Sequence, residues 1–198
     1  TDAAHPQLMS EVDEFSRKAL ELSKANPLVL SLVGLARVMV EQNADAGSIL
    51  ARDAVALSPY NAHAHLAHAV ALSRAGDDTG ALDAARRGAE IAARTAHVHW
   101  WEAASGLVAI RCGNFAAAIA HYEAAHYRAP GFRAAMRHLL FLYLWAGERE
   151  KAARLYRALL RAEPDFSLER ILHEPGYPAV TLRNSGLLTR FGDALSGL

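Results

Sequence analysis

The chain contains little of what most enzymes and membrane proteins require. Its 198 residues include one cysteine, Cys112, which excludes an intrachain disulfide and fits a reducing compartment, so we expect a cytoplasmic protein. No apolar run is long enough to cross a bilayer, and we expect no membrane partner. The sequence also has no Gly-rich phosphate loop, no Ser elbow and no Cys-x-x-Cys pair. These absences predict a non-catalytic protein without a cofactor.

An excess of charge of one sign is also lacking. The 21 basic and 21 acidic residues give a formal net charge of zero, and the isoelectric point is about 7.1. Lysine occurs only as Lys18, Lys24 and Lys151, and the arginines are scattered along the chain. Nucleic-acid-binding proteins usually carry a basic stripe and have a high isoelectric point. We therefore expect no direct contact with nucleic acid.

Aromatic and β-branched residues are few, whereas alanine and leucine are abundant, and this composition favours helix. The apolar pattern and the Gly and Pro breaks predict long helices over 10–25, 28–42, 46–58, 62–75, 79–93, 98–111, 115–128, 132–145 and 148–162, and short ones over 167–173, 179–185 and 187–195. Expected N-caps are Ser10, Asp78 or Thr79, and Ser167. The helix 28–42 is apolar all round, which predicts burial on all sides, with helix 10–25 as a candidate cover.

A set of four residues recurs with a fixed spacing. The residues Gly113, Ala118, Tyr122 and Pro130 return 34 residues later as Gly147, Ala152, Tyr156 and Pro164. The pair Gly76 and Ala81 lies 37 residues before its counterpart, so three extra residues separate these copies, around 94–97. Pro59 marks a fourth, degenerate copy. A 34-residue helix-turn-helix period is the signature of tetratricopeptide repeats (TPRs), and the chain resembles that family over roughly residues 10–164.

The resemblance implies an all-α fold, a right-handed α-solenoid of about four helix pairs. We expect a leading helix within 1–27, repeats over 28–164, and helices over 165–198 that cap the last apolar face. In this scheme Gly76, Gly113 and Gly147 end first helices in the left-handed conformation. The recurring alanines sit where paired helices cross closely, the tyrosines fill the space between adjacent repeats, and the prolines end second helices. These residues are structural and are not candidate sites.

The two ends of the chain suggest a larger context. Residues 11–25 look like the second helix of a repeat whose first helix is missing, which predicts that the chain was cut from a longer protein; an array that begins on an unpaired helix is the alternative. The tail, through motifs such as Thr181–Leu182–Arg183 and Ser185–Gly186–Leu187–Leu188, resembles bacterial TPR domains that follow adenylate cyclase or winged-helix regulator domains. We therefore expect a regulatory part of a bacterial signalling or transcription-regulating protein.

The resemblance also predicts a site, because first helices of successive TPRs line a concave groove that holds a peptide or helix. Mapped here, the predicted groove residues are His63, Leu66, Arg74, Trp100, Leu107, Arg111, Arg137, Phe141 and Trp145, with Val29, Leu32, Ala36 and Met39 in the first repeat. Aromatic anchors beside arginine are typical of binding hot spots. We expect an apolar or amphipathic protein or peptide partner. The alternatives are that the chain's own tail fills the groove, that the same surface forms a homodimer, or that an enclosed pocket around Trp100, Trp101, Arg111, Phe141 and Trp145 senses a small molecule.

The ten histidines and the cysteine offer the remaining chemistry. His65 and His68 are three residues apart on one predicted helix and could share an ion, but no acidic residue or cysteine completes a ligand set nearby. Cys112 lies in a turn with no evident histidine partner in the sequence. We expect neither a metal site nor enzymatic activity.

Overall fold

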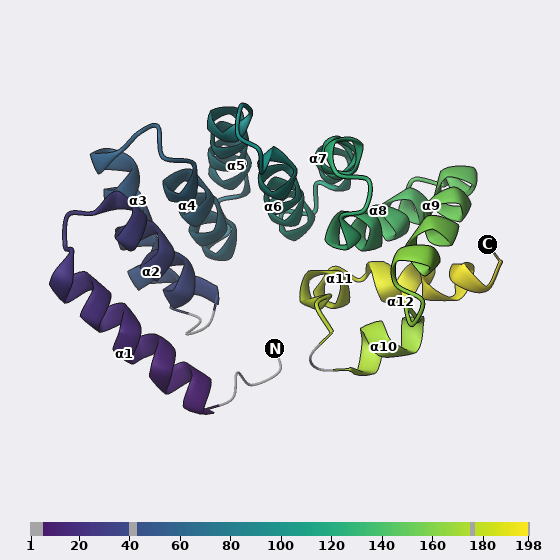
Figure 1. Cartoon of the computed structure of the whole chain (residues 1–198), viewed down its shortest axis with the longest axis horizontal. Helices are drawn as coiled ribbons and strands as arrows, with labels where there is room; N and C mark the ends of the chain where they lie inside the picture. The colour runs from purple at the N-terminus through teal and green to yellow at the C-terminus, as the bar shows by residue number, and fades with distance from the viewer. Residues whose placement is uncertain (1–5, 40–42, 175–176, 198) are drawn as a thin grey trace. The chain divides into compact units, whose positions relative to one another are not determined.

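The computed structural model describes residues 6–39, 43–174 and 177–197, and these residues form helices and no strand. The chain divides into two compact units, Thr1–Ala96 and His97–Leu198 (Figure 1). The boundary falls at the three extra residues that separate the second and third repeats in the sequence. The fold is an all-α solenoid built from helix pairs, as predicted.

The N-terminal unit holds one unpaired helix and two helix pairs. Its helices are α1 (Pro6–Leu22), α2 (Pro27–Met39), α3 (Ala44–Leu57), α4 (Ala62–Ala75) and α5 (Asp78–Ala92). The members of each pair, α2 with α3 and α4 with α5, pack along their lengths, and both α2 and α3 also pack against α4. The core includes Leu30, Ala54 and Ala64, with Leu20 of α1 packed against it.

The C-terminal unit holds two further pairs and the tail. Its helices are α6 (Val98–Arg111), α7 (Phe115–Arg128), α8 (Arg133–Trp145), α9 (Arg149–Ala162), α10 (Leu168–His173), α11 (Val180–Asn184) and α12 (Leu187–Phe191), closed by the 3-10 helix η1 (Gly192–Gly197). Helix α8 is central, because ten consecutive residues from Ala135 to Leu144 are buried. In this unit α12 packs against α8, and α11 packs against α6.

Local chemistry fixes the helix ends. Glycines in the left-handed region, at φ 83°, 68° and 77°, follow the first helices of three pairs at Gly76, Gly113 and Gly147, as predicted. The predicted N-cap Ser167 is confirmed, since its hydroxyl accepts from the backbone N–H of Arg170. The other two N-cap predictions are wrong. Ser10 lies inside α1, and the side chain of Asp77, one residue before the predicted cap, accepts from Gly80 N–H.

The prediction that helix 28–42 is buried on all sides is wrong. Three large side chains of α2 remain exposed, with 43% of Leu28, 50% of Leu32 and 56% of Met39 accessible to solvent. Their spacing of four and then seven residues places them on one face of the helix, away from the face through which α2 packs on α3. Helix α1 packs against α2 but leaves this face uncovered.

A close crossing of α6 and α7 gives a testable prediction. An added Cβ at Gly106 would lie 2.6 Å from Cε2 of Tyr122, which is fully buried and stacked on His138 with ring centroids 5.0 Å apart. Because neither ring has room to move, Gly106→Ala should lower the free energy of unfolding by about 1–3 kcal/mol. The control is Gly88→Ala, whose new Cβ meets atoms no closer than 3.4 Å and should stabilise the helix by up to about 1 kcal/mol. Urea unfolding of both variants checks the prediction, and equal effects would contradict it.

Candidate interaction surfaces

The predicted groove residues fall into both units. His63, Leu66 and Arg74 belong to α4 of the N-terminal unit, and the other six belong to α6 and α8 of the C-terminal unit. Leu66 is buried, while His63 and Arg74 are half-buried. Burial lowers the pKa of His63, so this imidazole is neutral near pH 7. Helix α4 therefore offers little exposed apolar surface of its own.

The six residues of the C-terminal unit differ sharply in exposure. Phe141 is fully buried and Arg137 nearly so, whereas 45% of Trp100 and 38% of Trp145 remain accessible. Each exposed indole packs edge-on against a neighbouring ring, Trp100 on Trp101 at 5.0 Å and Trp145 on Phe115 at 5.2 Å. Leu107 is half-buried and Arg111 is exposed. Phe141 and Arg137 thus have almost no surface to offer a partner in this structure.

Arg137 is buried because the tail returns to it. Its Nε and Nη2 donate to one carboxylate oxygen of Glu163, at 2.9 and 2.7 Å, and the Tyr177 hydroxyl donates to the other oxygen. The Arg137 guanidinium also lies over the Tyr177 ring, 4.9 Å from its centroid. All three residues are buried, and burial together with the bond to Glu163 raises the pKa of Tyr177 above its ordinary value. We call Arg137, Glu163 and Tyr177 the tail latch.

The tail helices complete this attachment. Leu182 of α11 and both Leu187 and Leu188 of α12 are buried, in the part of the unit where α11 packs on α6 and α12 on α8 (Figure 1). Arg183 of α11 donates to the carbonyl of Ile171, which ties α11 back to α10. Within the C-terminal unit, the chain's own tail therefore covers part of the first helices of both repeats.

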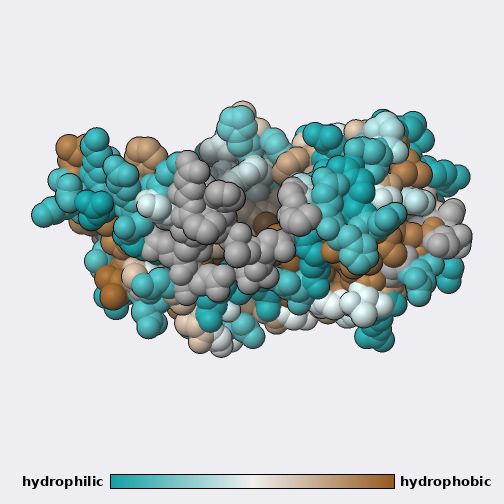
Figure 2. Space-filling model, turned by 90° about the horizontal axis from the view of Figure 1, so that it is seen from below, coloured by the Kyte–Doolittle hydropathy of each residue, from teal (hydrophilic) through white to brown (hydrophobic). Residues whose placement is uncertain are grey.

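The N-terminal unit presents an apolar surface instead. Leu28, Leu32 and Met39 are exposed on α2, and Phe15 and Leu22 are exposed on α1, seven residues apart and so on one face. We call these five residues the α1–α2 surface. The left part of Figure 2, which belongs to this unit, shows hydrophobic groups in brown among hydrophilic ones in teal. Isolated exposed apolar side chains are normal, but several exposed apolar side chains along one face of a helix are typical of a binding surface.

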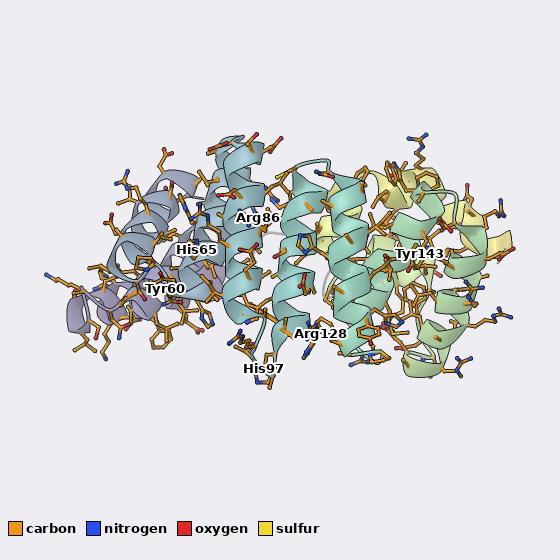
Figure 3. All side chains as sticks on the ribbon, turned by 90° about the horizontal axis from the view of Figure 1, so that it is seen from above. Tyr60, His65, Arg86, His97, Arg128 and Tyr143 are labelled. Atoms are coloured by element: carbon orange, nitrogen blue, oxygen red, sulfur yellow. The ribbon has the colours of Figure 1, made fainter. Side chains whose placement is uncertain are left out.

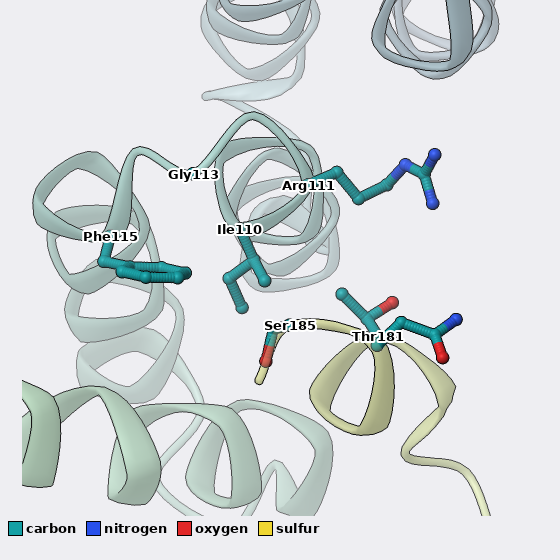
Figure 4. A pocket seen from close by; sticks show the side chains of 7 residues that line it. Ile110, Arg111, Gly113, Phe115, Thr181 and Ser185 are labelled. Atoms are coloured by element: carbon teal, nitrogen blue, oxygen red, sulfur yellow. The ribbon is translucent and has the colours of Figure 1, made fainter. Parts of the chain in front are cut away.

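A pocket of about 360 Å³ lies in the C-terminal unit, between the α6–α7 turn and α11 (Figure 4). It is lined by Ile110, Arg111, Gly113, Phe115, Thr181, Asn184 and Ser185. Of the five residues around which the sequence placed an enclosed pocket, only Arg111 is among those that line it. The tail residues were missed as site residues, because no sequence signal says which repeat the tail returns to.

Two of the histidines have partners within the fold. His65 lies on α4, where Figure 3 labels it, and its Nε2 atom is 2.8 Å from the carbonyl oxygen of Pro59, which precedes the helix. His121 pairs with Glu102 at 2.8 Å across α6 and α7. No group of three His, Cys, Asp or Glu side chains able to hold a metal ion occurs in the part of the chain that the structure describes. Among the described residues, no helix is long and apolar enough to cross a membrane.

These observations define the class of protein, which is a solenoid of helix pairs joined by left-handed glycine turns. Its described surface features are exposed apolar side chains. The tetratricopeptide repeat family model matches residues 109–170, which span the end of α6 to α10. Residues 109–170 therefore carry the tetratricopeptide repeat pattern. TPR domains are generally non-catalytic scaffolds that bind protein or peptide partners.

Solved structures share the fold along most of the chain. PilW, described as a widely conserved type IV pilus biogenesis factor, has a TM-score of 0.69 and 16% identity, over 97% of this chain and 86% of that chain. MamA has a TM-score of 0.61 and 21% identity, over 83% and 95%. YrrB, described as a TPR protein with an unusual peptide-binding site, has a TM-score of 0.56 and 21% identity, over 80% and 83%. No curated protein matches the chain.

Proposed function

We propose that this chain is a non-catalytic protein-interaction module that binds an apolar or amphipathic peptide on the α1–α2 surface. The observation that supports the proposal is the exposed stripe of Leu28, Leu32 and Met39 on the first helix of the first repeat. An amphipathic helix or extended peptide commonly binds by setting a few apolar anchors against such a stripe. In the C-terminal unit the tail already covers part of the corresponding helices, so the N-terminal unit has the more accessible apolar face.

The charge around this surface fits a peptide with few charges. Arg37 of α2, which lies beside the stripe in sequence, donates to Asp13 of α1 at 2.9 Å and so shares its charge with a carboxylate. A peptide that buries apolar side chains here therefore meets no large field of one sign. Affinity would come from apolar area, with the polar rim setting orientation. YrrB, which has the same fold, is described as carrying a peptide-binding site, and this likeness supports a peptide ligand.

The test is a substitution on the stripe. Leu32→Asp should lower the free energy of unfolding by no more than about 1–2 kcal/mol, because half of the side chain is already exposed. It should weaken binding of the partner by about tenfold or more, as expected for the loss of a central anchor. The measurement is affinity purification from cell lysate, followed by titration of each purified candidate protein with wild-type and variant chains.

A matched control separates the stripe from general surface hydrophobicity. Leu57 on α3 is 54% exposed and lies outside the α1–α2 surface, so Leu57→Asp should bind the partner as the wild type does. Equal binding by all three chains would contradict the proposal. Dissociation of a dimer by Leu32→Asp, seen by analytical ultracentrifugation, would identify a second copy of the chain as the occupant instead.

The wider context is proposed on the sequence alone. The tail motifs resemble those of bacterial TPR domains that follow adenylate cyclase or winged-helix domains, and this resemblance supports a regulatory role in signalling or transcription. In such a protein, the α1–α2 surface would bind either another domain of the same chain or a separate regulator.

A further inference from the structure

The pocket in the C-terminal unit has walls from two different parts of the chain. Ile110, Arg111, Gly113 and Phe115 come from the end of α6, the turn and the start of α7, whereas Thr181, Asn184 and Ser185 come from α11 and the residue after it. Its volume of about 360 Å³ lies within the range of small-molecule sites, roughly 300–1,000 Å³. A molecule bound here would touch the repeats and the tail at the same time.

The repeat wall is apolar with one cation. Figure 4 shows Ile110 directed toward the tail segment and Phe115 on one side of it, while the Arg111 side chain extends from α6 toward the other side. Phe115 is held in place by the edge-on contact with Trp145. At Gly113 an added Cβ would meet no atom within 4 Å, so the turn leaves open space beside this wall.

The tail wall supplies polar groups that the described fold does not use. The Ser185 hydroxyl is already engaged, since it donates to the Leu182 carbonyl and accepts from the Leu187 N–H. The Thr181 hydroxyl and the Asn184 amide, by contrast, have no side-chain hydrogen bond to any described residue. Both can donate to an acceptor on a ligand. No acidic side chain is among the described residues that line the pocket.

We propose that this pocket binds a small organic carboxylate. The carboxylate would take the Arg111 guanidinium and the Thr181 and Asn184 donors, and its apolar body would lie against Ile110 and Phe115. An arginine matches a carboxylate with two parallel charge-assisted hydrogen bonds. A cationic ligand would be repelled by Arg111, and a purely apolar one would leave the Thr181 and Asn184 polar groups buried without a partner. The chemistry of the lining therefore selects an anion with an apolar end.

Such a ligand would strengthen the attachment of the tail. It would contact the docked arrangement of α11 and the α6–α7 turn, and a ligand that binds only one arrangement stabilises that arrangement by mass action. The site is in a different unit from the α1–α2 surface and takes a different class of ligand. The two proposals can therefore fail independently.

The experiment uses the whole chain, labelled with ¹⁵N, and four probes of similar size. Hexanoate and benzoate carry the carboxylate, hexanamide is the neutral match, and hexylammonium has the opposite charge. At least one carboxylate should shift the backbone resonances of the α6–α7 turn and α11 with a dissociation constant of about 1 mM or tighter, an affinity reasonable for a ligand of this size. Hexanamide should bind about tenfold more weakly, and hexylammonium should not bind. Amide hydrogen exchange in α11 should slow when the carboxylate is present.

Substitutions then assign the contact. Arg111→Gln should weaken carboxylate binding about tenfold or more, and Thr181→Val should weaken it by a smaller factor, as expected for a charged and a neutral hydrogen bond. Arg154→Gln, on the exposed face of α9, is the matched control and should bind as the wild type does. The proposal is overturned if neither carboxylate shifts these resonances at about 10 mM. It is also overturned if Arg111→Gln binds them as tightly as the wild type.

Discussion

Replacing Glu163 with alanine is expected to lower the free energy of unfolding by about 3–5 kcal/mol. The carboxylate accepts three hydrogen bonds within the tail latch, two from Arg137 and one from Tyr177, and all three side chains are buried. Without it, the Arg137 guanidinium stays in the interior with no counter-charge, and removal of one partner of a buried ion pair has an effect of this size. Chemical denaturation of the wild type and Glu163→Ala measures the difference.

An exposed ion-pair network provides the control. Asp83 on α5 accepts from Arg86 at 2.6 Å and from Arg87 at 3.0 Å, but all three side chains are about half exposed. Solvent screens such pairs, so Asp83→Ala should change the free energy of unfolding far less than Glu163→Ala does. The double variant Arg137→Met with Glu163→Leu removes both charges together and should recover most of the stability lost in Glu163→Ala. A loss in Glu163→Ala no larger than in Asp83→Ala would show that the latch does not hold the fold.

The latch also decides which surface of the C-terminal unit a partner can reach. While Tyr177 and Glu163 are in place, Arg137 is engaged on two sides, by an ion pair and by the Tyr177 ring. Loss of the latch should therefore speed amide hydrogen exchange in α10, α11 and α12 more than in α6 and α7. If the predicted groove around Arg137 ever binds a partner, the tail must first leave it.

The helix pairs were predictable because each boundary depends on nearby residues. Helices 62–75, 98–111 and 115–128 have the expected ends. The first two end at turns that contain Gly76 and Gly113, both in the left-handed region. The third begins directly after its N-cap residue, Asn114. The 34-residue period repeats these boundary residues in successive helix pairs, which strengthens the prediction. The first helix was misplaced at its start because Ser10 is a good N-cap residue in isolation, yet α1 begins earlier, at Pro6, a residue well suited to the first turn of a helix.

The surfaces were less predictable, because they depend on contacts between residues far apart in sequence. Glu163 binds Arg137, 26 residues away in sequence, and Tyr177, 14 residues away, and no local sequence pattern predicts either contact. The exposed face of the apolar helix α2 was unpredictable for the same reason. Its composition alone could not tell that Val33 and Val38 are buried while Leu32 is exposed, since all are apolar. Arg111 is a predicted groove residue that lines the pocket, but its neighbours there come from the tail.

Lowering the pH should destabilise the C-terminal unit through His138. This imidazole is fully buried in α8, where it stacks on Tyr122 and its Nδ1–H donates to the Ala134 carbonyl at 2.7 Å. Its other nitrogen, Nε2, is buried with no hydrogen-bond partner in the described part of the chain. Burial lowers the pKa of His138 from 6.5 to about 4. The hydrogen bond to Ala134 raises this pKa and the charge of Arg137 lowers it, but both effects are smaller than that of burial. The native protein therefore keeps this ring neutral well below pH 6.

The sign of the effect follows from proton binding. Above pH 6.5 the ring is neutral in both states and contributes nothing to the pH dependence. As the pH falls from 6.5 to about 4, the unfolded chain binds a proton that the native chain does not, so the free energy of unfolding falls. The difference between the two pKa values corresponds to a total loss of about 3 kcal/mol. The loss is complete once the pH is below the native pKa.

A variant without the titrating group isolates this contribution. His138→Phe keeps the stacking on Tyr122 and removes the unpaired nitrogen, so it should be at least as stable as the wild type near pH 7 and should lose about 3 kcal/mol less between pH 6.5 and 4. His173→Gln, at an exposed histidine of α10, is the control and should follow the wild-type pH dependence. Urea unfolding of the three chains across this pH range gives the slopes. Parallel curves for the wild type and His138→Phe would mean that the ring takes up its proton in the native state, and that α8 opens to water at a pH where the rest of the unit is still folded.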